Sequence, residues 1–302
     1  MKNSILILFF GLLGYASQAQ DVIEAVPSPV TALKDTTYWN SEISAGLNFN
    51  QAAFSGNWKS GGVNSVAFGS IISGKANYAK EKISWDNDLE FLFGIVKNEG
   101  QGTRKAADRI FLDSKLGYKI SDHWGYFTAV NFISQFADGF EYGDNGNDLL
   151  ISSFLAPGFL TASLGLEYKP NDEFALRLSP FSPRLTFVTN TEIINNVPNN
   201  YGVDPGKKVR GELLAFLVYA TWKKQISENF TINSRYQMFG NYETLSFKNI
   251  DHRLDVTLVA KITSFIDVTF TSINLYDIDM DPGIQYSQAL ALGVLYKISN
   301  KK

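Results

Sequence analysis

The chain has 302 residues, a formal net charge of −3 and 19% charged residues. This weakly acidic balance argues against nucleic-acid binding, which requires clustered lysine and arginine. Because the sequence contains no cysteine, it excludes disulfides, thiolate metal sites and cysteine nucleophiles, and a lipoprotein anchor is not expected. The 23 Phe, 14 Tyr and 24 Gly residues favour strands and turns.

The N-terminus has the features of a secretory signal peptide. Lys2 supplies a positive charge, Ile5–Leu13 form an apolar run, and Ser17 and Ala19 are the small residues of a cleavage site. A run this short cannot cross a bilayer as a helix, which needs about 20 residues. We therefore expect a signal peptide over residues 1–19, with an N-terminal anchor helix as the alternative.

Residues 20–38 are predicted to form a periplasmic N-terminal extension. Pro27 and Pro29 interrupt this segment, which also lacks sustained alternation of apolar and polar residues. A plug that enters the lumen of the following domain is the alternative.

From Trp39 to Ile298 the chain divides into about a dozen segments in which apolar and polar residues alternate. Ile83–Ile95 has an acidic face opposite an apolar face that only Asn87 interrupts, and Asp108–Ile120 has a largely basic face opposite an apolar one. Outer-membrane strands of about 9–11 residues alternate in this way between lipid and lumen. The pattern predicts an all-β fold over residues 39–302: a transmembrane antiparallel up-and-down β-barrel of the outer-membrane type with about 12 strands. The alternation recurs in Phe230–Met238, His252–Ile262 and Tyr286–Ile298.

The links between these segments alternate in length. Short links are expected at 79–82, 121–123, 170–173, 227–229 and 263–265. Longer or more polar links are expected at 55–63, 97–107, 137–157, 190–211, 240–250 and 278–285. Outer-membrane barrels have short periplasmic turns and longer external loops, so we expect both ends of the barrel on the periplasmic side.

Two segments fit the alternation less well. Glu212–Trp222 is apolar on both faces, and the strand after Phe174 contains Pro180 and Pro183. Proline removes a hydrogen-bond donor from the strand ladder, so a bulge or a strand end is expected there.

The charged faces are predicted to point into the lumen, because a lipid-facing Arg or Lys near the bilayer midplane costs about 2–4 kcal/mol. The acidic segment 83–95 neighbours the basic segment 108–120, so ion pairs between them are expected. Such pairs either hold the lumen shut or line a path for ions or a charged substrate. The lumen candidates are Asp86, Asp88, Glu90, Arg109, Lys115, Arg177, Arg235, Arg253 and Asp255.

The long link Ala137–Pro157 joins a polar, glycine-rich half to an apolar half. A loop of this length is usually functional or disordered, and its apolar half would be costly to leave in water. Leu150, Phe154 and Leu155 are therefore predicted to be buried, either as a constriction against the inner wall or beneath a partner. The alternative is that Leu149–Leu155 extends the following strand above the membrane.

Candidates for catalysis are few. A lipid or peptide hydrolase would need a histidine with a nearby serine or acid, and Ser246 and Asp251 lie near His252 without forming a recognised motif. The other histidine, His123, falls in a short link. We expect no catalytic residue and no cofactor, with an outer-membrane enzyme as the alternative.

Asp277, Asp279 and Asp281 are spaced like the start of a calcium loop, in which oxygen ligands alternate along the chain. Pro282 stands where glycine is expected, and Gln288 replaces the bidentate glutamate. Asp-Pro-Gly is also a common turn sequence. The three aspartates are calcium candidates, with a plain turn as the alternative.

Several stretches resemble an uncharacterised family of Bacteroidota outer-membrane β-barrel proteins, a domain of unknown function. The most specific are Asn-Trp-Lys-Ser-Gly-Gly at 57–62 and Ser-Phe-Leu-Ala-Pro-Gly at 153–158, joined by Tyr-Lys-Pro at 168–170 and Tyr-Gly-Val-Asp-Pro-Gly at 201–206. The resemblance covers nearly the whole chain after residue 19 and implies a barrel in the outer membrane. It implies no catalytic or ligand-binding residues.

The sequence thus predicts a location, the cell outer membrane with its lipid, more closely than a task. A twelve-stranded interior falls between filled eight-stranded barrels and aqueous 16–18-stranded porins. The leading hypotheses are a channel or transport barrel for small solutes and a subunit of an assembly with other envelope proteins. A secreted soluble β protein is a further alternative, and no nucleic-acid partner is expected.

Overall fold

The computed structural model describes residues 38–299, except residues 58, 60–61, 144–146, 198–199 and 264–265. The predicted signal peptide and nearly all of the predicted extension, residues 1–37, lie outside the described residues. Among the residues that are described, no helix is long and apolar enough to cross a membrane.

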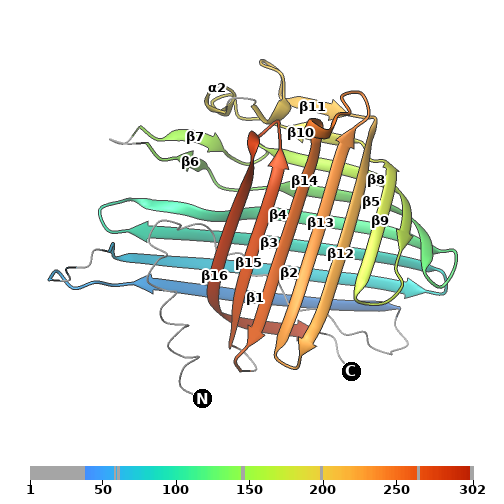
Figure 1. Ribbon diagram of the computed structural model, residues 1–302, viewed down its shortest axis with the longest axis horizontal. Helices are drawn as coiled ribbons and strands as arrows, with labels where there is room; N and C mark the ends of the chain where they lie inside the picture. Colours follow the sequence, from blue (N-terminus) through green and yellow to red (C-terminus); the bar gives the residue numbers. More distant parts are fainter. Residues whose placement is uncertain are drawn as a thin grey trace.

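Twelve antiparallel strands form a closed barrel, as predicted (Figure 1). Each pairs with the next around the ring, and β1 pairs with β16 to close it. In order around the ring the strands are β1 (Trp39–Ala52), β2 (Ser65–Lys80), β3 (Ile83–Asn98), β4 (Thr103–Lys119), β5 (Trp124–Ser134), β8 (Gly158–Tyr168), β9 (Phe174–Phe181), β12 (Ala215–Ser227), β13 (Phe230–Asn241), β14 (Ile250–Lys261), β15 (Ile266–Asp277) and β16 (Asp281–Ser299).

The alternation of residue types explains the two surfaces of the barrel. Large apolar side chains point outward along the strands; the Leu47 side chain, for example, is 69% exposed. Polar neighbours in the same strands, such as Ser44 and Asn48, are buried inside. A closed ring pairs each strand with two neighbours, and an apolar exterior suits hydrocarbon. The chain is therefore a barrel of the outer-membrane type.

Aromatic side chains form a belt at the end of the barrel that carries the short links. Trp39 lies 5.3 Å from Tyr78 and 5.7 Å from Trp85 between ring centroids, and Trp124 lies 4.8 Å from Tyr168. Tryptophan and tyrosine favour the interface between lipid and water, so this belt marks one membrane boundary.

The links bear out most of the predicted alternation in length. The five predicted short links all join adjacent strands. Two links are shorter than predicted: β3 and β4 are joined by residues 99–102 only, and β15 and β16 by residues 278–280. The strands pair for longer than the alternation indicated, because ladder pairing continues where lipid no longer dictates side-chain polarity.

The two prolines mark an elbow in the barrel wall, as predicted. β9 ends at Phe181 and β10 (Arg184–Phe187) follows directly; both pair with β8, at its two ends. β11 (Val209–Glu212) pairs with β10 and precedes β12 after two residues. The apolar segment 212–222 is therefore divided between β11 and β12. Above the elbow, the β10–β11 hairpin leaves the twelve-stranded ring.

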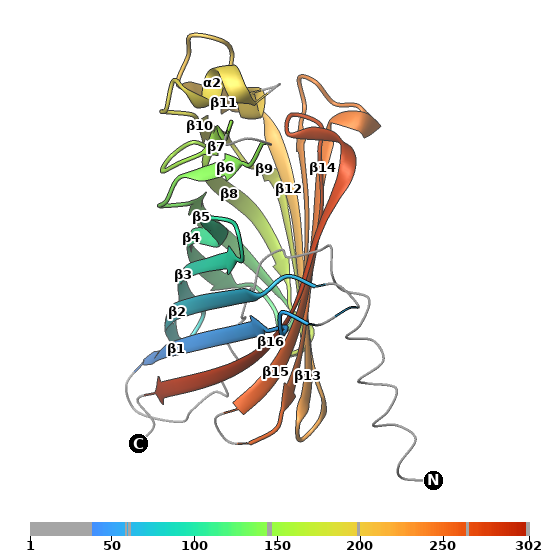
Figure 2. The same ribbon diagram turned by 90° about the vertical axis from the view of Figure 1, so that its left-hand side faces the viewer.

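A second bend occurs in β16, which belongs to both walls of the barrel. Its first part, up to Val294, pairs with β15, whereas residues 293–299 pair with β1. At the bend, a Cβ on Gly293 would lie 2.7 Å from Asn48 Oδ1 and 3.0 Å from Asp267 Oδ1, so a larger residue would displace these two side chains. The two walls, β1–β5 and β12–β15, cross at a steep angle and separate above this junction (Figures 1 and 2).

The two longest loops pack together as a cap at the end of the barrel opposite the short links (Figure 2). The first contains β6 (Gly139–Glu141) and β7 (Leu149–Ser152), and the second contains α2 (Ile193–Asn196) and the single turn η3 (Asn200–Gly202). Their shared core consists of Leu150, Ala156, Val188, Ile193 and Val203.

Polar contacts join the two loops as well. The Tyr201 hydroxyl donates a 2.7 Å hydrogen bond to the Ile151 carbonyl, and Asn196 Nδ2 donates a 2.9 Å bond to the Leu150 carbonyl. Burial raises the pKa of Tyr201 to about 12, so this hydroxyl stays protonated and able to donate.

The packing of the cap tests the predicted burial of three residues in the loop 137–157. Leu150 is buried as predicted, but its neighbours are other cap residues and not the inner wall. Leu155 is half-buried. Phe154 is 52% exposed, so the prediction that it packs within the chain as part of a constriction is wrong. Its exposure follows from the tight turn at residues 153–156, whose ends bond to each other through Ser153 and Ala156.

The assignment of outward and inward faces can be tested with Leu112→Arg, a substitution on the outer face of β4. We expect it to lower the free energy of unfolding by about 2–4 kcal/mol, because arginine would enter hydrocarbon. Leu149→Arg, at an equally exposed leucine in the cap, should change it by less than about 0.5 kcal/mol. Urea unfolding in lipid vesicles, followed by tryptophan fluorescence, measures both. Equal effects would contradict the assignment.

Candidate functional site

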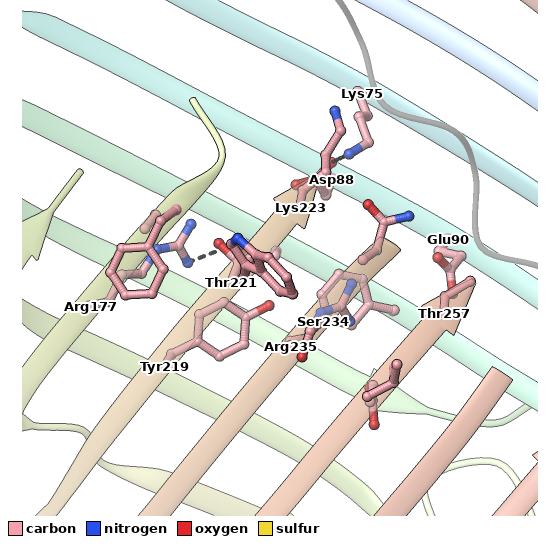
Figure 3. A pocket seen from close by; sticks show the side chains of 18 of the residues that line it. Lys75, Asp88, Glu90, Arg177, Tyr219, Thr221, Lys223, Ser234, Arg235 and Thr257 are labelled. Carbon is pink, nitrogen blue, oxygen red and sulfur yellow. Dashed lines mark hydrogen bonds and ion pairs between the residues drawn. The ribbon is translucent and has the colours of Figure 1, made fainter. Parts of the chain in front are cut away.

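The lumen contains a polar cavity of about 430 Å³. Its lining includes Asp172 and Glu173 from the link between β8 and β9, so the cavity reaches the short-link end of the barrel. Figure 3 shows side chains of β2 and β3 on one wall and those of β9, β12 and β13 on the other. The lining contains seven basic and seven acidic residues, which leaves the cavity without excess charge.

A second, much smaller space of about 30 Å³ adjoins the cavity and shares part of its lining. Residues from opposite walls meet there: the Arg235 guanidinium of β13 lies 5.5 Å from the ring centroid of Phe111 on β4. Tyr219 of β12 lines both spaces, and the Arg177 guanidinium lies 5.3 Å from its ring centroid. The narrow space holds only about one or two water molecules. Arg235, Phe111 and Tyr219 therefore form a constriction.

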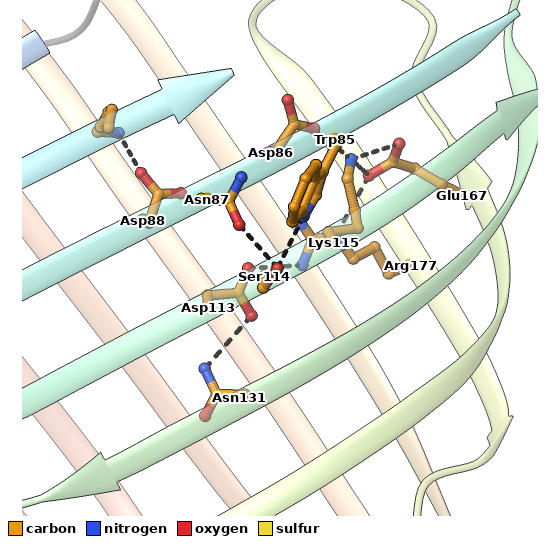
Figure 4. A network of polar contacts seen from close by, with 11 residues as sticks. Trp85, Asp86, Asn87, Asp88, Asp113, Ser114, Lys115, Asn131, Glu167 and Arg177 are labelled. Atoms are coloured by element: carbon orange, nitrogen blue, oxygen red, sulfur yellow. Dashed lines mark hydrogen bonds and ion pairs between the residues drawn. The ribbon is translucent and has the colours of Figure 1, made fainter. Parts of the chain in front are cut away.

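A network of ion pairs crosses the wall beside the cavity (Figure 4). Lys115 Nζ lies 3.1 Å from Asp86 Oδ2 and 2.7 Å from Glu167 Oε1. Arg177 donates to the same Glu167 oxygen at 3.2 Å and lies 3.4 Å from Asp113 Oδ2. Glu167 thus joins two cations from different strands. All but Asp86 are largely buried, so each charge depends on its partners.

Two further ion pairs neutralise the acidic strand β3. Arg109 Nη2 donates to Glu90 Oε1, and Lys75 Nζ lies 3.2 Å from Asp88 Oδ1. The pairs of Asp86 with Lys115 and of Glu90 with Arg109 join β3 to β4, as expected for neighbouring strands of opposite charge. Asp88 instead pairs with a lysine of β2.

Figure 4 also shows polar side chains on the outer face of the same strands. Ser114 Oγ donates a 2.7 Å hydrogen bond to Asn87 Oδ1 and accepts one of 2.9 Å from Trp85 Nε1. Asn87 and Ser114 are register partners and are the two interruptions of their apolar faces. Each therefore satisfies the other where water is excluded.

Ion pairs also hold the β10–β11 hairpin across the cap end of the lumen. Arg184 of β10 bonds to Asp251 of β14 at 2.9 Å, and its guanidinium lies 3.4 Å from the centroid of the Phe239 ring. Arg210 of β11 bonds to Asp279, in the link between β15 and β16, at 2.5 Å. The hairpin is thereby tied to the opposite wall.

The structure places all the lumen candidates on inward-facing positions or in ion pairs of the lumen, while their role in conduction stays a prediction. Arg253 and Asp255 bond to each other at 2.9 Å on β14. Sequence reasoning missed Lys75, Phe111, Glu167 and Tyr219. Glu167 could have been identified from the sequence, because it is the only charged residue in the alternating segment 158–168.

The three calcium candidates do not form a metal site. Within the described residues, no group of three or more His, Cys, Asp or Glu side chains is arranged to hold a metal ion. Asp277 Oδ1 accepts the backbone N–H of Asp279, and Asp281 Oδ1 accepts that of Gly283. These are turn contacts, and Asp279 also bonds to Arg210.

His252 lies on the outer face of β14 among tyrosines. Its Nδ1 is 2.8 Å from the Tyr236 hydroxyl, and its ring centroid is 6.5 Å from that of Tyr276. Asp251, the acid beside it in sequence, pairs with Arg184 at the lumen. His123 packs at 6.4 Å against Tyr168 in the short link.

Comparison with known proteins gives a partial family match. Residues 49–140 match the model of a protein family of unknown function, DUF3078. This range includes the Asn-Trp-Lys-Ser-Gly-Gly stretch and ends before Ser-Phe-Leu-Ala-Pro-Gly. No curated protein matches the chain.

Solved structures of several outer-membrane barrels are similar to this chain. An outer-membrane channel from Pseudomonas putida F1 has 9% identity and a TM-score of 0.41, covering 91% of this chain and 100% of its own. The NanC porin has 10% identity and a TM-score of 0.40, covering 85% and 100%. The translocator domain of the autotransporter NalP from Neisseria meningitidis has 10% identity and a TM-score of 0.36, covering 87% and 89%.

The ion-pair network makes a prediction for Glu167→Gln. We expect a loss of about 2 kcal/mol in the free energy of unfolding, because Lys115 and Arg177 lose a buried counter-charge. Asp172→Asn, which removes the fully exposed acid of a surface pair with Lys169, should have no measurable effect. Urea unfolding in lipid vesicles tests both variants. If Glu167→Gln behaves like Asp172→Asn, the network contributes nothing to stability.

Proposed function

We propose that the protein is a narrow outer-membrane channel for small polar solutes, with a binding cavity on the short-link side of a constriction. The observation that carries this proposal is the cavity of about 430 Å³ that ends where Phe111 and Arg235 meet. Its volume falls within the range of about 300–1,000 Å³ that is common for small-molecule sites. Short turns lie on the periplasmic side in such barrels, so the cavity opens toward the periplasm.

The lining suits small molecules that carry both charges or many hydroxyl groups. Equal numbers of acids and bases, most of them paired, leave no strong field to favour one sign of ion. Thr257 and Thr271 contribute hydroxyl groups on the opposite wall. A solute would replace water in hydrogen bonds with these groups without separating a buried ion pair. We therefore expect low conductance and weak selectivity between anions and cations.

The constriction can be opened by the double substitution Phe111→Ala and Arg235→Ala. We expect single-channel conductance in planar bilayers to rise at least about threefold, because two large side chains from opposite walls are removed. Swelling of proteoliposomes in a small zwitterionic amino acid should accelerate in parallel.

Leu116→Ala is the matched control, since it shortens a side chain on the outer face of the same strand. Its conductance should equal that of the unaltered protein. A double variant that inserts normally and shows no increase in conductance would contradict the proposed channel.

A further inference from the structure

β16 has a long free edge. Residues 293–299 pair with β1, but residues 281–292 pair only with β15. Across from them, residues 49–52 of β1 pair only with β2. In the part of the chain that the structure describes, no strand occupies the space between these edges. Figure 2 shows the two walls diverging here above the β1–β16 junction.

This free edge is costly in a membrane. In an antiparallel strand, alternate residues direct both their N–H and C=O groups to the same side, so about half of residues 281–292 present unpaired groups. Their side chains face lipid: Ile284 and Tyr286 are 75% and 74% exposed, and Leu290 and Leu292 are also exposed. Each backbone group left unpaired in hydrocarbon costs several kcal/mol. The edge therefore requires a polar partner.

Polar side chains gather beside the same edge. Ser272 Oγ accepts hydrogen bonds from Asn274 at 3.2 Å and from Gln288 at 3.5 Å, on the outer face of β15 and β16. Gln288 is exposed between apolar residues. Two buried amide donors near the edge, Gln285 Nε2 and, on the lumenal side, Asn48 Nδ2, have no hydrogen-bond partner among the described residues. Hydrogen-bonding side chains therefore lie beside the unpaired backbone of the edge.

A second copy of the chain does not fit this edge. Two copies inserted in the same direction are related by an axis along the membrane normal. Because barrel strands tilt by about 35–45°, the two β16 edges would cross at about 70–90° and could not form a ladder.

The chain's own N-terminal extension is badly placed for the edge. It enters β1 at Trp39, and the free edge begins beside Asn48, about 30 Å further along the strand. About nine residues of a 19-residue extension would be used to cover that distance, so the remaining ten could not pair along all twelve residues of the edge.

We propose that an extended segment of another envelope protein adds to β16 as an antiparallel strand at residues 281–292. Strand addition supplies the missing backbone hydrogen bonds, and alternate side chains supply specificity. The partner segment would be apolar where it meets lipid beside Leu290 and Leu292, and would carry a hydrogen-bonding side chain beside Gln288. This role goes beyond solute passage and does not depend on it.

Photo-crosslinking in living cells of the native host tests the proposal. Benzoylphenylalanine is placed at Ile284 or Leu290 in the full chain, with Leu116 on β4 and Val130 on β5 as exposed controls on strands away from the edge. We expect both edge positions, and neither control, to form an adduct with the same protein. Mass spectrometry should locate the two crosslinks about six residues apart in one partner segment, in reversed order along its sequence.

Other results would overturn the proposal. Adducts with residues 20–37 would assign the edge to the chain's own extension, and adducts of twice the chain's mass would assign it to a second copy. No protein adduct at either edge position would leave lipid or water at the edge. Hydrogen exchange gives an independent measure: amides of residues 281–292 should exchange at least about tenfold more slowly in native membranes than in the purified protein in detergent. Equal rates would also contradict strand addition.

Discussion

The backbone of a strand that crosses a bilayer has no water to bond to, and the rest of this structure depends on that constraint. Each strand must pair on both sides, which closes the sheet into a ring of twelve strands. The lipid also dictates side-chain polarity on the outer face, so apolar residues alternate with polar ones along β3 and β4. The two polar residues on the outer faces of these strands, Asn87 and Ser114, are register partners that bond to each other, so neither is left without a partner in lipid. The place where the rule fails, residues 281–292 of β16, is for this reason the most informative part of the wall.

Inside the barrel, the opposite problem arises, because many charges are confined in a small space. The solution is local neutralisation: β3 acids pair with cations of β2 and β4, and Glu167 serves both Lys115 and Arg177. Such pairing leaves a cavity rich in hydrogen-bonding groups and poor in net charge. The constriction is built differently, from the rings of Phe111 and Tyr219 and the guanidinium of Arg235. Polarity and width of the lumen are therefore set by separate groups of residues.

Alternation in the sequence was sufficient to predict twelve strands, their short links and the inward face, because lipid enforces a period of two. It failed at 97–107 and 278–285, where strands continue beyond the apolar band and pairing alone maintains them. The ion pair of Glu90 with Arg109 was predictable, since it joins sequence neighbours in a hairpin. Contacts across the lumen, such as Phe111 with Arg235, were not, because they depend on strand tilt and on the flattening of the barrel. The fate of the apolar loop 149–155 depended on a second loop 50 residues away.

The elbow at Ser182 and Pro183 has a consequence for the surrounding lipid. β9 contains eight residues, fewer than the 9–11 of an ordinary spanning strand. Tilted by about 45°, it covers about 19 Å of the membrane normal, against an apolar band of about 25 Å. A span this short favours shortened or tilted acyl chains beside β9 over those beside β3 or β4. The barrel therefore presents unlike flanks to the membrane, a short strand at β9 and, elsewhere on its circumference, the unpaired edge of β16.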